Sequence, residues 1–251
     1  MTIAPADLTT YQVCDVPIAA LTPGLAAQTI VTNALEGGAF EVHLCNAYTL
    51  SLVGDDLQLE NALGAAHLNL PDGAPVAWLG RNMGTEGPVR GPGLVGDVAR
   101  LGVGFGIKHF LYGGAEGVAE LVQARLEADA PGVQIVGVEC PPWRDLEDDE
   151  LVALAQRIAA TGATIVWVGL GTPRQDYLVR RLAPLLECAV VPVGAAFDFL
   201  AGRVGEAPKI LHGSGLEWVH RLVSEPRRLW RRYLFGNPKF MIRAVRSRRR
   251  Q

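Results

Sequence analysis

The sequence lacks the cysteine spacing, the long apolar runs and the leader pattern that identify several classes of protein. Its four cysteines, Cys14, Cys45, Cys140 and Cys188, lie far apart and form no CxxC pair, which argues against a zinc site or a disulfide framework and fits a reducing cytoplasm. No uninterrupted apolar stretch approaches the roughly 18 residues of a membrane-spanning helix, and the first ten residues lack a basic region followed by an apolar core. We therefore expect any contact with a membrane to be peripheral.

Acidic or histidine clusters with the spacing of metal ligands are also missing from the sequence. No Asp-x-Asp pair occurs, and the five histidines are not spaced like the ligands of one ion. The pairs Asp55-Asp56 and Asp148-Asp149 are better interpreted as solvated charge. We expect neither a bound metal nor another cofactor.

The charge is distributed very unevenly along the chain. The net charge is −3 over 251 residues, and 49% of the residues are hydrophobic, which is ample for a buried core. The segment 203–251 holds thirteen Lys or Arg residues against three Glu residues and carries +10, whereas the preceding residues sum to −13. The chain therefore consists of an acidic body and a strongly basic tail.

Apolar runs of strand length alternate with helical patterns through most of the chain. We expect strands at 40–44, 67–70, 107–111, 133–138, 164–168 and 189–193, and helices at 22–35, 46–53, 58–65, 115–129, 147–160 and 174–186. This alternation predicts a Rossmann-like α/β fold with a mostly parallel, doubly wound sheet. Strand patterns stop near Ala201, so we expect an α/β catalytic domain over residues 1–200 and a short basic helical appendage over 201–251.

Ligands bind beyond the carboxyl ends of the strands in open α/β sheets. That rule gathers Asn46, Asp72, the glycine turn at 169–175 and the segment 194–198 on one edge. The turn follows an apolar run and should lead into a helix at about Arg174, with backbone N–H groups facing an anion. A carboxylate on this edge, such as that of Asp72, could take a proton from a substrate hydroxyl.

The basic tail has apolar residues at helical spacing. Leu216, Val219, Leu222 and Val223, then Leu229, Trp230, Tyr233 and Leu234, recur at intervals of three and four residues among many arginines. Pro226 and Pro238 suit first-turn positions and predict about three short helices. Such a unit could lie on an anionic membrane, pack on the core with its arginines outside, or form a nucleic-acid patch.

Several phrases of the sequence together resemble one known family. These are LPDG at 70–73, the Asn at 46 after a strand, GTPRQD at 171–176, GAAFDFLAG at 194–202, and GLEW followed by EPRRLWRRY between 215 and 233. In this order, over roughly residues 11 to 240, they resemble the WecG/TagA/CpsF glycosyltransferases. Members of that family transfer a sugar from a UDP-sugar to a polyprenyl-diphosphate-linked amino sugar at the inner face of the bacterial membrane. The resemblance implies the same two substrates and a cytoplasmic enzyme held peripherally at that anionic surface.

The resemblance also implies roles for particular residues. Asp72 would be the catalytic base and Arg90 would lie beside the donor diphosphate, for which a guanidinium is well suited. The residues matching the substrate-binding positions are Asn46, Gly169, Gly171, Thr172, Gln175 and Asp198, and those expected to meet the lipid diphosphate or the membrane are Arg221, Arg228, Arg231 and Arg232.

On the residues alone, more ordinary interpretations remain open at each position. Asp72-Gly73 could form only a turn or helix cap, Asn46 only a cap, and Arg90 only a solvated charge. Gln175 could simply begin a helix, and Asp198 could bind a ligand or tie its own loop together.

Three positions depart from the family pattern: Leu44 stands for a Thr, Val95 for an Asp and Glu206 for an Arg. If these changes disabled the chemistry, the chain would be a non-catalytic nucleotide-sugar or lipid-diphosphate binding protein. A nucleic-acid binder is the third possibility, but the chain lacks a recognisable reading motif. A homo-oligomer is also possible.

Overall fold

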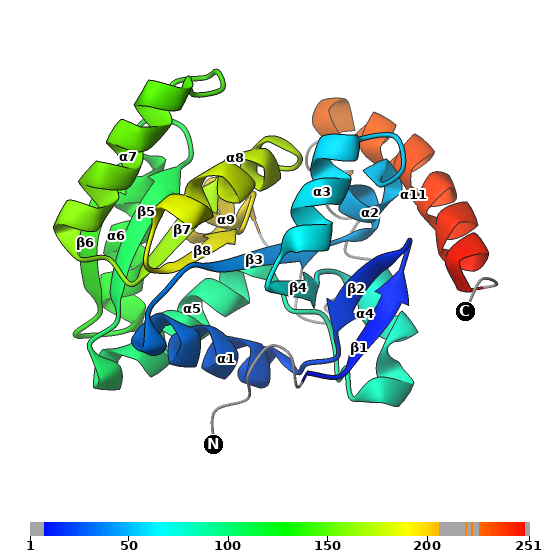
Figure 1. The fold of residues 1–251 in the computed structure, drawn as a ribbon, viewed down its shortest axis with the longest axis horizontal. Helices are drawn as coiled ribbons and strands as arrows, with labels where there is room; N and C mark the ends of the chain where they lie inside the picture. Colours follow the sequence, from blue (N-terminus) through cyan, green and yellow to red (C-terminus); the bar gives the residue numbers. More distant parts are fainter. Residues whose placement is uncertain (1–7, 206–218, 220–221, 223–225, 249–251) are drawn as a thin grey trace.

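The computed structural model describes residues 8–205, 219, 222 and 226–248, which contain a six-stranded parallel sheet with helices on both faces (Figure 1). The strand order is β4-β3-β8-β7-β5-β6. The strands are β3 (Phe40–Cys45), β4 (Leu68–Pro71), β5 (Lys108–Gly113), β6 (Gln134–Glu139), β7 (Ile165–Gly169) and β8 (Ala189–Pro192). The expected Rossmann-like α/β fold is confirmed.

Two helical layers enclose this sheet. One layer contains α1 (Pro23–Glu36), α5 (Gly91–Gly102), α6 (Val118–Asp129) and α9 (Ala196–Leu200). The other contains α7 (Asp148–Thr161) and α8 (Arg174–Leu182). Beside β3 and β4 lie α2 (Ala47–Leu52), α3 (Leu57–Ala65) and α4 (Ala74–Leu79), followed outward by α11 (Pro226–Arg248) (Figure 1).

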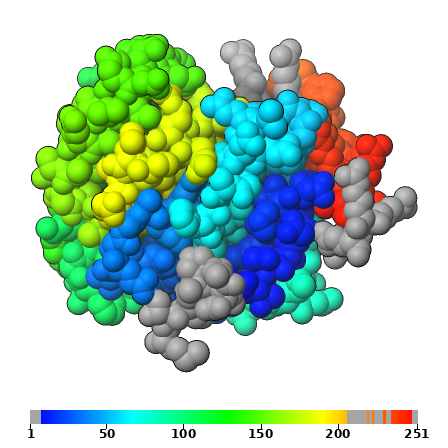
Figure 2. Space-filling model, in the orientation of Figure 1, coloured from blue at the N-terminus to red at the C-terminus, as the bar shows by residue number. Residues whose placement is uncertain are grey.

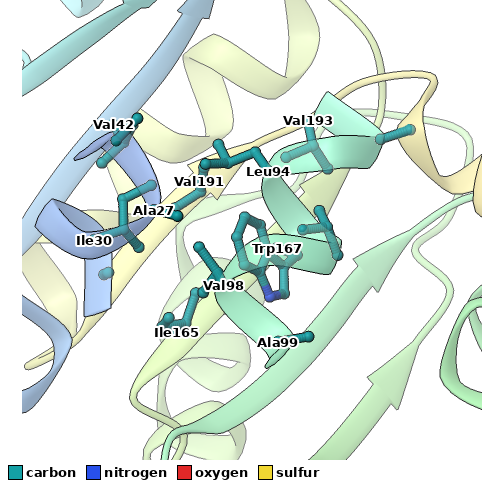
Figure 3. Close-up of a cluster of buried hydrophobic side chains, with 14 of the residues drawn as sticks. Ala27, Ile30, Val42, Leu94, Val98, Ala99, Ile165, Trp167, Val191 and Val193 are labelled. Carbon is teal, nitrogen blue, oxygen red and sulfur yellow. The ribbon is translucent and has the colours of Figure 1, made fainter. Parts of the chain in front are cut away.

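Side chains alternate between the two faces of each strand, and this alternation determines which residues enter which layer of the core. On β7, Ile165 and Trp167 point into the layer of α1 and α5, where Trp167 is fully buried near Val98 and Val191 (Figure 3). Val166 on the same strand points to the opposite layer, against α7 and α8. Because both faces are covered, the strands are mostly apolar, and the strand-length apolar runs locate them correctly.

The starts of α1 and α8 lie where the sequence predicts them. The Thr22 side chain accepts a hydrogen bond from the Leu25 N–H (3.2 Å), and Pro23 is the first residue of α1. The expected helix after the glycine turn begins at Arg174.

A hairpin that precedes α1 was not expected from the sequence. It pairs β1 (Thr10–Val13) with β2 (Val16–Ala19) through a two-residue turn in which Cys14 and Asp15 both have positive φ, 53° and 63°. Asn-Gly or Asp-Gly usually occupies such turns, so the sequence Cys-Asp does not predict one. Tertiary contacts support the turn, because Ser247 of α11 accepts from the Asp15 N–H and donates to the Asp15 carboxylate.

Helix α5 was also missed, because its glycines and proline disfavour a helix in isolation. Close packing explains the glycines at its two ends. A Cβ added at Gly91 would lie 3.0 Å from the Val193 carbonyl oxygen, and one added at Gly102 would lie 2.8 Å from the Ile107 Cβ. Residues without side chains are therefore required where α5 meets its neighbours.

The expected break of the tail at Pro238 is wrong, and most of the tail before Pro226 lies outside the described residues. Pro226 begins a helix as expected, but α11 continues for 23 residues through Pro238. An internal proline normally costs about 3 kcal/mol of helix stability, and tertiary packing offsets that cost here. Phe240 and Ala244 are buried against the hairpin and α2, and Lys239 and Arg243 form ion pairs with Asp55.

A buried ionic cluster ties α8 to β3. His43 on β3 is fully buried, with Nδ1 2.8 Å from Asp176 Oδ1 and Nε2 3.0 Å from Glu41 Oε1. Arg180 donates to the other oxygen of Glu41 at 3.0 Å. Because both ring nitrogens face carboxylates, both must be donors, and His43 is an imidazolium.

The pKa values of this cluster agree with the geometry. Burial alone would lower the pKa of His43, but its hydrogen bonds to Asp176 and Glu41 raise it to about 9. Burial would raise the pKa of Glu41, but the hydrogen bond from His43 helps to hold it below its usual range. His43 and Glu41 therefore both stay charged at neutral pH.

We expect His43→Gln to lower the free energy of unfolding by about 3 kcal/mol at neutral pH, because it leaves buried carboxylates without their cation. The stabilisation by the imidazolium is complete below its ordinary pKa of 6.5 and is lost as the pH rises through about 9. Urea unfolding from about pH 7 to pH 10 should therefore show the gap between wild type and variant shrinking.

His109→Gln is the matched control. His109 is equally buried, but it accepts a hydrogen bond from Trp167, and burial lowers its pKa to about 4, so it is neutral at pH 7. Its variant should show no alkaline change in the gap. A wild-type-to-His43→Gln gap that stays constant over the same range would mean that His43 is not charged.

Candidate active site

Asn46 and Asp72 meet at the carboxyl edge of the sheet. β3 and β4 run parallel with Cys45 opposite Pro71, so the next residue of each strand emerges at the same place. The Asn46 side-chain Nδ2 donates to Asp72 Oδ2 at 3.2 Å, and the Asp72 N–H donates to the Cys45 carbonyl at 2.9 Å. Two of the residues selected from the sequence are therefore in direct contact.

Asn46 is both a helix cap and a partner of the carboxylate. Its Oδ1 accepts from the N–H groups of Tyr48 (3.0 Å) and Thr49 (3.1 Å) at the start of α2. Because the oxygen is fixed by these two donors, the NH₂ group must point the other way, toward Asp72. The cap thus orients the amide rather than competing with its contact to Asp72.

Asp72 is half-buried and does not cap the following helix. The N-cap of α4 is Gly73, whose φ of 86° suits glycine, and no side chain caps this helix. The structure therefore does not support the simpler interpretation, in which the Asp72 carboxylate only caps a helix. The carboxylate instead accepts from Asn46.

Arg90 lies at the same edge. The preceding residue, Val89, donates its N–H to the Pro71 carbonyl at 2.7 Å, which brings the chain alongside the residue before Asp72. Arg90 is then the N-cap of α5 and is half-buried. Backbone hydrogen bonds between β3, β4 and the segment at Val89 thus bring Asn46, Asp72 and Arg90 to one edge, although they are distant in sequence.

The glycine turn is braced by Gln175. Gln175 is 4% exposed, and its Oε1 accepts from the Gly171 N–H at 2.9 Å while its Nε2 donates to Thr172 Oγ1 at 3.4 Å. The Gly171 N–H, which we expected to face an anion, is therefore directed at Gln175. A Cβ at Gly194 would lie 3.5 Å from Gln175 Oε1, so this side chain lies between the turn and the end of β8.

Gly169 and Asp198 are brought to the same stretch of the edge. A Cβ at Gly169 would lie 2.8 Å from the ring of Phe197, which is buried on α9. Asp198 is half-buried, and its carbonyl accepts from the N–H groups of Arg203 and Val204, which closes the end of α9. The absence of a side chain at Gly169 allows α9 to approach the turn.

The thiol nearest the site is not suited to act as a nucleophile. Cys45 is fully buried, and burial raises its pKa well above the usual value, with further increases from the carboxylates of Asp176 and Asp72. The thiol therefore stays protonated.

Sequence reasoning missed the importance of Asp176. It is fully buried and pairs with His43, so it anchors the helix whose first turn contains Gln175. The signal was available, because an ionisable residue within an otherwise buried helix face requires a partner. The partner itself, 133 residues away, could not be found from local spacing.

The departures from the family pattern fall in two settings. Leu44 and Val95 are buried in the apolar layer between the sheet and α5. Glu206 lies outside the described residues, as does Arg221. Arg228, Arg231 and Arg232 belong to α11, but their side chains also lie outside the described part.

Within the described part of the chain, no group of three or more His, Cys, Asp or Glu side chains could hold a metal ion. None of its helices combines the length and the apolar character needed to cross a membrane.

Comparison with known proteins identifies the family of the whole chain. The model of the glycosyl transferase WecG/TagA/CpsF family matches residues 11–251. A curated relative from Bacillus spizizenii is 30% identical over 193 residues, which cover 76% of this chain and 72% of the relative. That relative is named an N-acetylglucosaminyldiphosphoundecaprenol N-acetyl-beta-D-mannosaminyltransferase. The chain is a glycosyltransferase and belongs to the WecG/TagA/CpsF family.

Proposed function

We propose that this enzyme is an inverting glycosyltransferase that moves a sugar from a UDP-sugar to a polyprenyl-diphosphate-linked sugar in cell-surface polysaccharide assembly. The donated sugar would be an N-acetylmannosamine-type sugar or a hexose. The observation that carries the proposal is the Asn46–Asp72 hydrogen bond at the carboxyl edge of the sheet. The name of the Bacillus relative, which specifies a lipid-diphosphate acceptor, supports the substrate class.

In this proposal Asp72 is the general base. Asn46 holds one carboxylate oxygen, which fixes the plane of the group while an acceptor hydroxyl approaches. Asp72 takes the hydroxyl proton as the acceptor oxygen attacks the anomeric carbon. The bond from that carbon to the diphosphate oxygen breaks on the opposite side, so the configuration inverts and UDP leaves.

Arg90 and the glycine turn would stabilise the departing diphosphate. Arg90 caps the amino end of α5, so its guanidinium charge adds to the positive end of the helix dipole. Gly169, Gly171, Thr172 and Gln175 form the turn at the amino end of α8, and Asp198 lies beside it on α9. Of these groups, the Arg90 guanidinium and the amino ends of α5 and α8 would stabilise the developing negative charge without reorganisation.

α11 supports a peripheral contact with an anionic membrane surface at the cytoplasmic side. Leu229, Phe240 and Ala244 are buried, the last two in the cluster with the hairpin and α2, whereas Leu234, Phe235 and Ile242 are more than half exposed. α11 lies along the outer side of α2 (Figure 1), and Figure 2 shows it at the surface. An amphipathic helix with an exposed apolar side and many arginines, among them Arg228, Arg231 and Arg232, suits an anionic surface.

The direct test incubates the purified protein with a panel of UDP-sugars and a short-chain lipid-diphosphate acceptor. We expect one UDP-sugar to yield a glycosylated lipid and free UDP in equal amounts. Binding of UDP without transfer to any acceptor would favour a non-catalytic binding protein. Absence of both binding and transfer would contradict the proposal.

We expect Asp72→Asn to lower turnover by at least about a hundredfold while the protein still folds and binds UDP, because an amide cannot accept the proton. Initial rates and UDP titration measure the two effects. Asp97→Asn on α5, which removes an exposed carboxylate paired with Arg100, is the matched control and should keep its turnover. Near-normal turnover of Asp72→Asn would remove Asp72 from the mechanism.

Arg90→Ala should weaken UDP binding or slow transfer by about tenfold or more, as expected when a charged hydrogen-bond donor to a phosphate is lost. Calorimetric titration with UDP and steady-state rates would measure this. Arg100→Ala on the same helix, more than half exposed, should match the wild type. If both UDP affinity and rate survive in Arg90→Ala, the guanidinium has no role at the diphosphate.

The membrane contact is best tested on the exposed side of α11, because deleting the helix would uncover the apolar side chains that it buries. We expect Phe235→Ser with Ile242→Ser to reduce sedimentation with anionic liposomes several-fold, and added salt to weaken wild-type binding. Leu185→Ser, at an exposed apolar position far from α11 in sequence, is the control. Unchanged sedimentation of the double variant would leave α11 a structural element only.

A further inference from the structure

An exposed tryptophan lies beside the glycine turn, in the loop that follows β6. The loop is tied to the turn by two steps: Cys140 Sγ donates to the Gly114 carbonyl at 3.4 Å, and the Gly114 N–H donates to the Gly169 carbonyl at 2.9 Å. Trp143 in this loop is 87% exposed. A large aromatic side chain left in water at the ligand-binding edge is a candidate contact for a substrate.

Arg174 connects Trp143 to the turn. It is the first residue of α8, directly after Gly169–Pro173, and its guanidinium carbon lies 5.2 Å from the centroid of the Trp143 ring. Its Nε also donates to Asp145 at 3.2 Å, which fixes the guanidinium between the loop and the helix. One face of the indole is therefore covered by a held cation, and the ring remains largely open to solvent.

The pocket beside this pair favours a flat, neutral group. It is partly open to solvent, and Arg174, Tyr112, Leu170 and Leu178 contribute to its lining. The other arginines that line it are already paired, Arg144 with Glu150 and Arg181 with Asp148. Because these charges are neutralised, the pocket does not favour a free anion. A planar ring with carbonyl oxygens could stack on Trp143 and accept hydrogen bonds from a guanidinium.

The spacing along the edge fits a nucleoside diphosphate sugar. β4, which precedes Asp72, and β7, which precedes the turn, are three positions apart in the strand order. At about 4.8 Å between strands, this separation is about 14 Å. A donor with its sugar at Asp72 and its diphosphate near the turn would carry its base past β7, toward Trp143.

We propose that Trp143 and Arg174 form the base-binding subsite of the donor, with the uracil ring stacked on the open part of the Trp143 ring. This inference rests on the proposed UDP-sugar donor and adds the part of the protein that recognises the nucleoside. The guanidinium of Arg174 serves both the indole and the edge of the base. The loop 140–147 thus selects the nucleotide, and the opposite end of the edge performs the transfer.

The test compares titrations of uridine, UDP and inorganic diphosphate on the full chain. Base stacking on an aromatic side chain is worth about 1–3 kcal/mol, so Trp143→Ala should weaken uridine and UDP binding by about tenfold or more and leave diphosphate binding unchanged. Trp143→Phe should recover most of the loss. Phe105→Ala, which removes an exposed aromatic ring near the opposite end of β5, should bind as wild type does.

The outcomes distinguish a failure of the base-subsite inference from a failure of the proposed UDP-sugar donor. If Trp143→Ala binds UDP as tightly as wild type while wild type transfers sugar, the base lies elsewhere and only this inference is wrong. Equal weakening of diphosphate and uridine binding would show that the loop shapes the whole site rather than the base subsite, which also overturns it. If wild type binds neither uridine nor UDP and transfers no sugar, the proposed donor is wrong as well.

Discussion

The parallel pairing of β3 with β4 is the constraint on which the rest of the site depends. Because Cys45 lies opposite Pro71, the next residues, Asn46 and Asp72, emerge side by side at one edge. A slip of one residue in this pairing would turn the alternating side chains over and separate the amide from the carboxylate. The fold therefore positions the proposed base through backbone hydrogen bonds, and the Asn46 cap completes its orientation.

The buried cluster around His43 extends this constraint to the middle of the sheet. By joining β3 to α8, the imidazolium connects the strand that ends at Asn46 with the helix whose first turn contains Gln175. Replacing such a cluster by apolar residues often preserves stability, so stability alone does not explain it. Because the cluster joins β3 to α8, we infer that it fixes the position of Asn46 relative to Gln175.

Features set by local chemistry were predictable from the sequence, and those set by distant contacts were not. The Thr22 cap, the strand before Asn46 and the turn before Arg174 all follow from neighbouring residues. The hairpin turn at Cys14-Asp15 depends on Ser247, which lies 232 positions away. The continuation of α11 through Pro238 likewise depends on distant residues, such as Asp55, which pairs with Lys239 and Arg243. Motifs selected the proposed site residues, but the Asn46–Asp72 contact could not be predicted without the strand order.

Hydrogen exchange with and without UDP tests most directly whether the carboxyl edge is one continuous donor site. We expect UDP to slow exchange of amides at 113–118, at 171–176 and at the start of α5 after Arg90, which lie along that edge. Amides at the opposite edge, such as those at 106–108 and 163–165, should be unchanged. Protection confined to the opposite edge, or to α11 alone, would contradict the account.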